Sequence, residues 1–361
     1  MKRLTLKAEG AGRLVPPAIL AACAFVLPPL LGAAGAAFLL TQLTMAAYYV
    51  LASLGLCALM GYAGQISLGQ AGFFAIGGYA SAFLCTRDLG PAASAPLARC
   101  LDLAGLLVRG ADPYGKALLS LAPWLSGLLA VLLAAAVAAL IGTPVLRLKG
   151  HYLAMATLGF GIVVEKVARG SKALGGADGI SAVPGLALWP GLEVTGGRAA
   201  RSANFTIAWL VLALGILALA NLVRSRPGRA LRALREGEEA ALAMGIDTAR
   251  YKLNVFVIAA VFAAVAGVLL THYNGSIGPG EASSTRSVRY VAIVAVGGMD
   301  NLVGTLAAGL VLNFLSLRGV FGNYDDAVFG AILILIMLLS PEGKAARAFH
   351  SLLPRGKGAP R

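Results

Sequence analysis

The chain has 361 residues, of which 58% are hydrophobic and only 13% are charged. Soluble domains carry about 25% charged residues, so this composition excludes an ordinary soluble protein and indicates a membrane protein with many spans. The formal net charge is +14, but the basic residues gather at the two termini and in one loop. That pattern is typical of membrane topology and argues against nucleic acid as a partner.

The first segments run from a basic tail into apolar sequence. Residues 1–14 carry four Lys and Arg residues, which favours a cytoplasmic N-terminal tail. Spans are expected at about 15–32 and 36–60. A third segment follows at 61–84, GYAGQISLGQAGFFAIGGYASAFL, and is unusually rich in glycine.

The glycine-rich segment has two interpretations, and both stay open at this point. Its small residues would let neighbouring helices approach closely. Alternatively, it is a broken helix whose backbone and polar groups line a translocation path. The candidate path residues are Gly64, Gln65, Ser67 and Gln70.

Further spans are expected at about 120–143, 151–169, 204–224, 248–273, 288–318 and 326–340. The sequence VGGMDN at 296–301 is expected to break the longest of these runs in two. The result is an all-α polytopic membrane protein with about 8–10 transmembrane segments. The lower number applies if segments 61–84 and 288–300 are re-entrant.

This organisation gives one membrane domain at 15–340, followed by a basic C-terminal tail at 341–361. Ten crossings would place both termini on the same side of the membrane. Eighteen of the 30 Lys and Arg residues then lie on that side. We therefore expect a multi-pass protein with cytoplasmic N- and C-termini.

The longest strongly polar interval inside the membrane domain is Arg224–Lys252. It holds seven of the 30 basic residues between two spans, so it is expected to be cytoplasmic. Its Ala, Leu, Arg and Glu content favours helix. Gly237 is expected to divide it, Gly245 suits the C′ position after a helix, and Asp247 suits the N-cap of the next span.

Sequence motifs for chemistry are missing from the chain. It has no GxxxxGK[ST] sequence for ATP binding, no HExxH and no GxSxG. The histidines lie far apart at segment ends, which indicates interfacial positions. We therefore expect no catalytic residues, no metal site and no cofactor bound by this chain. No carboxylate, Lys or Arg is expected near a span midpoint, which disfavours an ion-coupled transporter.

The polar interval contains E-A-A-x-x-x-G at 239–245, which resembles the coupling-helix motif of bacterial ABC importer permeases. More closely, residues 36–340 resemble the LivM-type permeases of branched-chain amino acid importers. Five stretches carry the resemblance, in this order: GYAGQISLGQAGFFAIGGYASA at 61–82, LRLKGHYLAMATLGFG at 146–161, GGADGISAVPG at 175–185, SRPGRALRALREGEEAALAMGIDTARYKL at 225–253 and VAIVAVGGMDNLVGTLAAG at 291–309.

The chain departs from the family pattern at two places. The wider motif often continues to Leu-Pro, and this chain has Leu253-Asn254. The late segment often has Gly-Ser and then Gly-Pro, and here Met299-Asp300-Asn301 and Gly304-Thr305 stand instead. The second departure leaves the packing around 297–306 open.

The resemblance implies a membrane subunit of an ATP-driven amino acid importer in the bacterial inner membrane. Its implied partners are a second, LivH-like permease, two ATP-binding cassette subunits that use ATP and Mg, and a periplasmic binding protein. The cytoplasmic coupling loop would be 225–247. Its docking residues would be Glu239, Ala240, Ala241 and Gly245, flanked by Arg229, Arg232 and Arg235.

Several alternatives remain at this stage. The three arginines could pair with ATPase carboxylates, or they could only set topology and touch anionic membrane lipid. The substrate could be urea or a short amide instead of a branched-chain amino acid. Functions of other classes are an ATP-independent secondary transporter or channel, and a structural membrane subunit.

Overall fold

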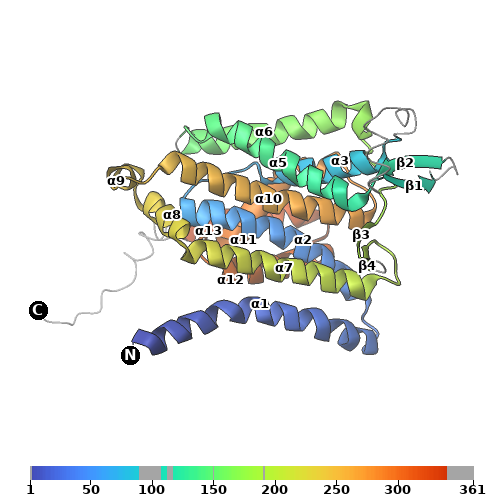
Figure 1. Cartoon of the computed structure of the whole chain (residues 1–361), viewed down its shortest axis with the longest axis horizontal. Helices are drawn as coiled ribbons and strands as arrows, with labels where there is room; N and C mark the ends of the chain where they lie inside the picture. Colours follow the sequence, from blue (N-terminus) through green and yellow to red (C-terminus); the bar gives the residue numbers. More distant parts are fainter. Residues whose placement is uncertain (1, 89–106, 112–116, 149, 190–191, 340–361) are drawn as a thin grey trace, which may run out of the picture.

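The computed structural model describes residues 2–88, 107–111, 117–148, 150–189 and 192–339 (Figure 1). Most of the expected loop 86–119 and the whole basic tail 341–361 lie outside the described residues. The described chain is a bundle of helices, so the expected α-helical membrane fold is confirmed. The helices in chain order are α1 (Lys2–Ala33), α2 (Phe38–Cys57), α3 (Gln70–Thr86), α5 (Pro123–Val145), α6 (His151–Gly170), α7 (Arg201–Arg224), α8 (Arg226–Glu236), α9 (Glu238–Ala243), α10 (Thr248–Asn274), α11 (Ser284–Gly297), α12 (Leu302–Leu317) and α13 (Asp325–Leu339).

Short strands occur in the two long loops, where no strand was predicted. β1 (Leu107–Ala111) pairs antiparallel with β2 (Ala117–Leu121). In the second loop, β3 (Leu186–Trp189) pairs with β4 (Leu192–Val194). Both hairpins lie at the end of the bundle opposite α8 and α9 (Figure 1).

Five helices within the described ranges are long and apolar enough to cross a membrane. They are Val15–Ala33, Phe38–Tyr62, Pro123–Val145, Arg201–Arg224 and Thr248–Asn274. The shorter helices pack against them: α3 lies against α10 and α5, and α12 lies against α2. α11 and α12 have 14 and 16 residues, because a turn interrupts what would otherwise be one long helix.

The centre of the bundle is α2, which packs against α7, α10, α11 and α12. Around it, small residues bring backbones into contact. A Cβ added to Gly267 of α10 would lie 2.0 Å from the carbonyl oxygen of Phe74 in α3. One added to Gly77 of α3 would lie 2.5 Å from the carbonyl oxygen of Ala264. The expectation that small residues in the third segment permit close helix approach is therefore confirmed.

The third segment, 61–84, is broken and not one continuous helix, as one of its two interpretations expected. A π-helical turn, Ala58–Tyr62, extends α2, and helix resumes only at Gln70. Gly64 has a φ of +66°, a conformation that ends a helix and favours glycine. The side-chain amide nitrogen of Gln70, Nε2, then donates to the carbonyl oxygens of Ala52 and Ala259 and fixes the start of α3.

The predicted break at 296–301 is confirmed between α11 and α12. Gly298 has a φ of +88°, and the Asn301 side chain accepts a hydrogen bond from the backbone of Gly304 as the N-cap of α12. This turn lies against the end of the π-helical turn. A Cβ on Gly61 would lie 1.6 Å from the carbonyl oxygen of Met299. The two interruptions of the helices, one after the π-helical turn and one between α11 and α12, are therefore in contact.

Candidate functional site

Helices α8 and α9 lie at one end of the bundle, where α1 also begins (Figure 1). Ser225 caps α8 by accepting from the backbone of Gly228. Gly237 separates α8 from α9, Gly245 has a φ of +79°, and Asp247 caps α10. The boundaries predicted from these glycines and this aspartate are therefore confirmed.

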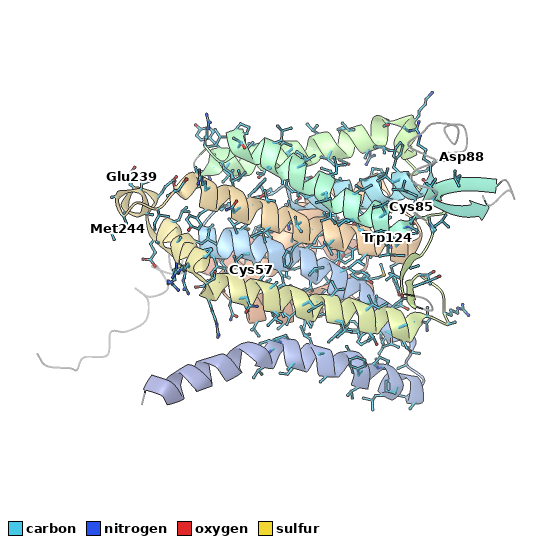
Figure 2. The ribbon with its side chains drawn as sticks, in the orientation of Figure 1. Cys57, Cys85, Asp88, Trp124, Glu239 and Met244 are labelled. Atoms are coloured by element: carbon cyan, nitrogen blue, oxygen red, sulfur yellow. The ribbon has the colours of Figure 1, made fainter. Side chains whose placement is uncertain are left out.

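The outer surface of α9 and its following turn is both acidic and apolar. Glu239, Ala240 and Gly245 are exposed, whereas Ala241 is buried against the bundle. Sequence reasoning missed the two neighbours that stand out most: Leu242 is 52% exposed and Met244 is 82% exposed. Figure 2 shows Glu239 and Met244 at the extreme end of the molecule. Both are large apolar residues within a polar interval, and this feature of the sequence could have identified them as surface contacts.

Arg229, Arg232 and Arg235 of α8 are all exposed, but Arg235 is hydrogen-bonded to its own chain. Its Nη1 donates to the carbonyl oxygen of Gly61 at 2.5 Å, and the same atom lies 3.6 Å from the Asp300 carboxylate. Arg235 thus joins α8 to the place where the end of the π-helical turn meets the turn between α11 and α12.

A cavity of about 490 Å³ lies between α8 and the bundle. A neighbouring cleft of about 170 Å³ continues from it toward Pro16 and Pro17 of α1. The inner part of α8 is therefore not fully packed against the bundle. The larger cavity is lined by Tyr62, Val223, Arg224, Arg232, Arg235, Glu236 and Asp300.

A second tie holds α9. The Lys252 ammonium of α10 donates to the Glu238 carboxylate at 2.6 Å, and the lysine side chain is only 5% exposed. Buried lysines need such a partner, because an unpaired buried charge is costly. α9 is therefore fixed to α10, and α8 to the end of α2.

The four residues expected to line a translocation path lie in the non-helical connection before α3 and at the first residue of α3. Gly64 is exposed and Gln65 half-buried. Ser67 and Gln70 are buried, and their polar groups are engaged within the chain: Ser67 accepts from the backbone of Gly69, and Gln70 holds α2 and α10. Two of the four thus serve local structure in this conformation.

The sequence did not predict a partly buried cluster of charges. Glu281 follows Pro279 in a short 3₁₀ turn, Pro279–Ala282, and Arg286 lies in the first turn of α11. Arg286 Nη2 is 3.1 Å from Glu281 Oε1, Tyr49 Oη donates to the same oxygen at 3.3 Å, and the guanidinium lies 5.1 Å from the Tyr49 ring. The expectation of no charge near a span midpoint concerned charges within the spans themselves. These two charges come instead from the loop 274–287, which folds back against α2 and α3.

His272 lies two residues from the end of α10, as expected, but inside the bundle. It is buried, and its ring nitrogens bond the Pro184 carbonyl and Ser81 Oγ, each at 2.7 Å. No group of three or more His, Cys, Asp or Glu side chains within the described ranges is arranged to hold a metal ion.

The chain from the start of α2 almost to the end of α13 matches a known sequence pattern. Residues 38–337 fit the family described as the branched-chain amino acid transport system permease component. The chain belongs to this family. It is therefore an integral membrane protein, and its relatives are transport permeases rather than enzymes.

Individual relatives have permease names. The LivM permease protein of the high-affinity branched-chain amino acid transport system of Escherichia coli is 32% identical over 324 residues, covering 83% of this chain and 68% of the relative. The LivH permease protein of the same species is 38% identical over 168 residues, covering 44% and 54%. The ribose import permease RbsC of Bacillus subtilis is 29% identical over 147 residues, covering 38% and 45%. No solved structure matches the chain.

Proposed function

We propose that this chain is one of two membrane subunits of an ATP-driven importer that carries branched-chain amino acids across the bacterial inner membrane. Similarity to both LivM and LivH supports pairing with a second, LivH-like permease. The observation that carries the ATP-driven part is the exposed α9 surface, with Met244 and Leu242 beside Glu239. Exposed apolar side chains next to charge are typical of a docking surface.

In this proposal, two ATP-binding cassette subunits supply ATP and Mg chemistry, and this chain binds no cofactor. Their closure would push α9 and α8 toward the bundle. The Lys252–Glu238 pair and the Arg235–Gly61 hydrogen bond pass that movement to α10 and to the end of α2. A packed bundle responds by shifting between discrete arrangements, which here would be inward-open and outward-open states.

The proposed orientation follows from charge. The end of the bundle that carries α8 and α9 also holds the start of α1 (Figure 1). The polar interval Arg224–Lys252, which contains α8 and α9, has seven of the 30 basic residues. We place it in the cytoplasm, with both basic tails, 1–14 and 341–361. The two hairpins at the other end would face the periplasm, where a substrate-binding protein delivers its ligand.

Docking is tested by Met244→Asp, which places a charge on the most exposed apolar side chain. Gly245→Leu is a second variant, because φ is +79° there and a branched side chain is strained. Both should lower substrate-stimulated ATPase activity of the reconstituted complex at least about tenfold, a loss of ~1.4 kcal/mol in coupling. Ala249→Asp is the matched control, since Ala249 is exposed at the same end but lies outside α9. Normal coupling and normal co-purification of the ATPases in both variants would refute the docking assignment.

The substrate needs its own measurement, since a related permease imports ribose. Uptake of labelled leucine into proteoliposomes should be competed by isoleucine and valine. Competition by urea or acetamide instead would overturn the amino acid assignment while leaving the ATP-driven part intact. Uptake that continues without ATPase subunits would indicate a secondary transporter or channel.

A further inference from the structure

The charge cluster around Glu281 lies deep in the bundle. Tyr49, which bonds the Glu281 carboxylate, stands near mid-length of the span Phe38–Tyr62. Each end of that span is therefore about 16–20 Å from Tyr49 along the helix axis. The 3₁₀ turn that carries Glu281 packs on α3 and α6. Both charges thus lie between helices, well away from the ends of α2.

The cluster is not sealed inside this chain. The Glu281 side chain is 19% exposed and the Arg286 side chain 29% exposed. Charged groups at such depth avoid lipid and face another protein surface or a water-filled cavity. The exposed side of the Glu281–Arg286 pair therefore faces a water-filled path, either within this chain or between this chain and the neighbouring permease.

The cluster also has unused hydrogen-bonding capacity. Within the described chain, Glu281 Oε2 and Tyr290 Oη are buried without a partner, and Tyr290 is only 2% exposed. Tyr290 lies four residues after Arg286 in α11, on the same face of the helix. An acceptor and a hydroxyl left unpaired beside an ion pair are costly, and such groups call for a further partner.

Two helix starts reinforce the local field. α11 begins at Ser284, two residues before Arg286, and Ser287 Oγ accepts from the backbone of Ala71 at the start of α3. The N-terminal ends of α3 and α11 are therefore adjacent. Partial positive charge at helix N-termini favours a carboxylate.

We propose that Glu281 and Arg286 form a transient binding station for the α-amino and α-carboxylate groups of an amino acid in transit. This inference rests on the proposed function. Arg286 would take the substrate carboxylate in a two-point hydrogen bond, and Glu281 would take the ammonium, which also lies against the Tyr49 ring. The pair exchanges its mutual contact for contacts with the substrate, so net affinity stays low and the substrate can leave.

The test uses the reconstituted importer with its binding protein and leucine. Glu281→Gln and Arg286→Met should each lower the maximal uptake rate about tenfold or more. The concentration of loaded binding protein that gives half-maximal activity should stay unchanged, because docking occurs at the periplasmic end. Stimulated ATP hydrolysis should continue, so that the ATP used per leucine rises at least fivefold. A purely structural role would not raise this ratio.

Two further variants separate binding from packing. The double exchange Glu281→Arg with Arg286→Glu keeps an ion pair but reverses its direction, and it should give folded protein with uptake as low as in the single variants. Arg289→Met breaks the neighbouring pair with Asp325, and it should leave uptake per folded complex within about twofold of wild type.

Each outcome has a defined meaning. Restored uptake in the double exchange, or wild-type uptake in both single variants, would overturn the binding station while the proposed importer function stands. A wild-type complex that fails to import any branched-chain amino acid would overturn the proposed function, and this inference with it.

Discussion

Arg235 of α8 donates a hydrogen bond to the carbonyl oxygen of Gly61, at 2.5 Å and across 174 residues of sequence. Gly61 ends the span of α2 and touches the backbone of Met299 in the turn between α11 and α12. One guanidinium therefore links the proposed docking element to both interruptions of the bundle. A hydrogen bond with a charged donor contributes about 1.5–3 kcal/mol, and the 40% exposure of Arg235 favours the lower value.

Removing this link should uncouple the complex. Arg235→Ala is expected to reduce substrate-stimulated ATPase activity and uptake about five- to tenfold, with little change in basal ATPase activity, because α8 would move without displacing Gly61. Arg235→Lys should be intermediate, since lysine keeps the charge but not the planar fork. Arg226→Ala, at an exposed site in the same helix, is the control. Equal effects of the 226 and 235 variants would contradict this role.

The buried pair between α10 and α9 predicts a non-additive double mutant. Lys252→Met leaves the Glu238 carboxylate without its partner and should destabilise the solubilised protein by ~2–3 kcal/mol, below the full buried value because Glu238 remains partly exposed. Adding Glu238→Gln should recover most of the loss. Thermal unfolding of the single and double variants measures the coupling. Strict additivity would show that the two side chains do not depend on each other.

The crossing of α3 and α10 requires glycine at position 267. Gly267→Ala places a Cβ 2.0 Å from a backbone oxygen, so the helices must separate, at a cost of ~1–3 kcal/mol or more. Gly159→Ala in α6 is the matched control, because nothing lies within 4 Å of its added Cβ. The control should be neutral or stabilising by up to ~1 kcal/mol. Thermal unfolding and the yield of folded protein distinguish the two, and equal stability would argue against a close crossing.

His272 fixes the loop before β3. A neutral ring that donates from Nδ1 to the Pro184 carbonyl must accept at Nε2 from the Ser81 hydroxyl. His272→Leu removes both bonds and should cost ~1–3 kcal/mol. Faster backbone hydrogen exchange is expected over 180–186, while α9 stays unchanged. His151→Leu, at the exposed start of α6, should leave exchange in both regions unaltered. Unchanged protection of 180–186 in the His272 variant would contradict an anchoring role.

Much of the local architecture could be predicted from the sequence. Long apolar runs predicted the major spans, and short-range signals predicted helix ends: Gly237 and Gly245 in the polar interval, Asp247 as an N-cap, and the break at 296–301. These features depend on residues a few positions apart, so no tertiary information was needed. The family resemblance rested on the same linear motifs, and the match over residues 38–337 confirmed it.

Other features depended on contacts between distant parts of the chain. By sequence, Arg235 is one of several arginines on a solvated helix, and only the structure shows that it bonds the carbonyl oxygen of Gly61. By sequence, Gln70 is a candidate path residue, and only the structure shows that its side-chain amide donates to the carbonyl oxygens of Ala52 and Ala259. Glu281 and Arg286 belong to a polar loop by sequence, and only the folding of that loop against α2 brings them to Tyr49.

The sequence by itself determined that this is a helical membrane protein of the permease family, with a basic, helical interval between two spans. Hydrophobicity, helix propensity and capping act over a few residues and are written directly in the chain. The tertiary structure alone decided which side chains meet. Those contacts depend on how helices that are far apart in sequence pack together, since burial and the pairing of polar groups select one arrangement.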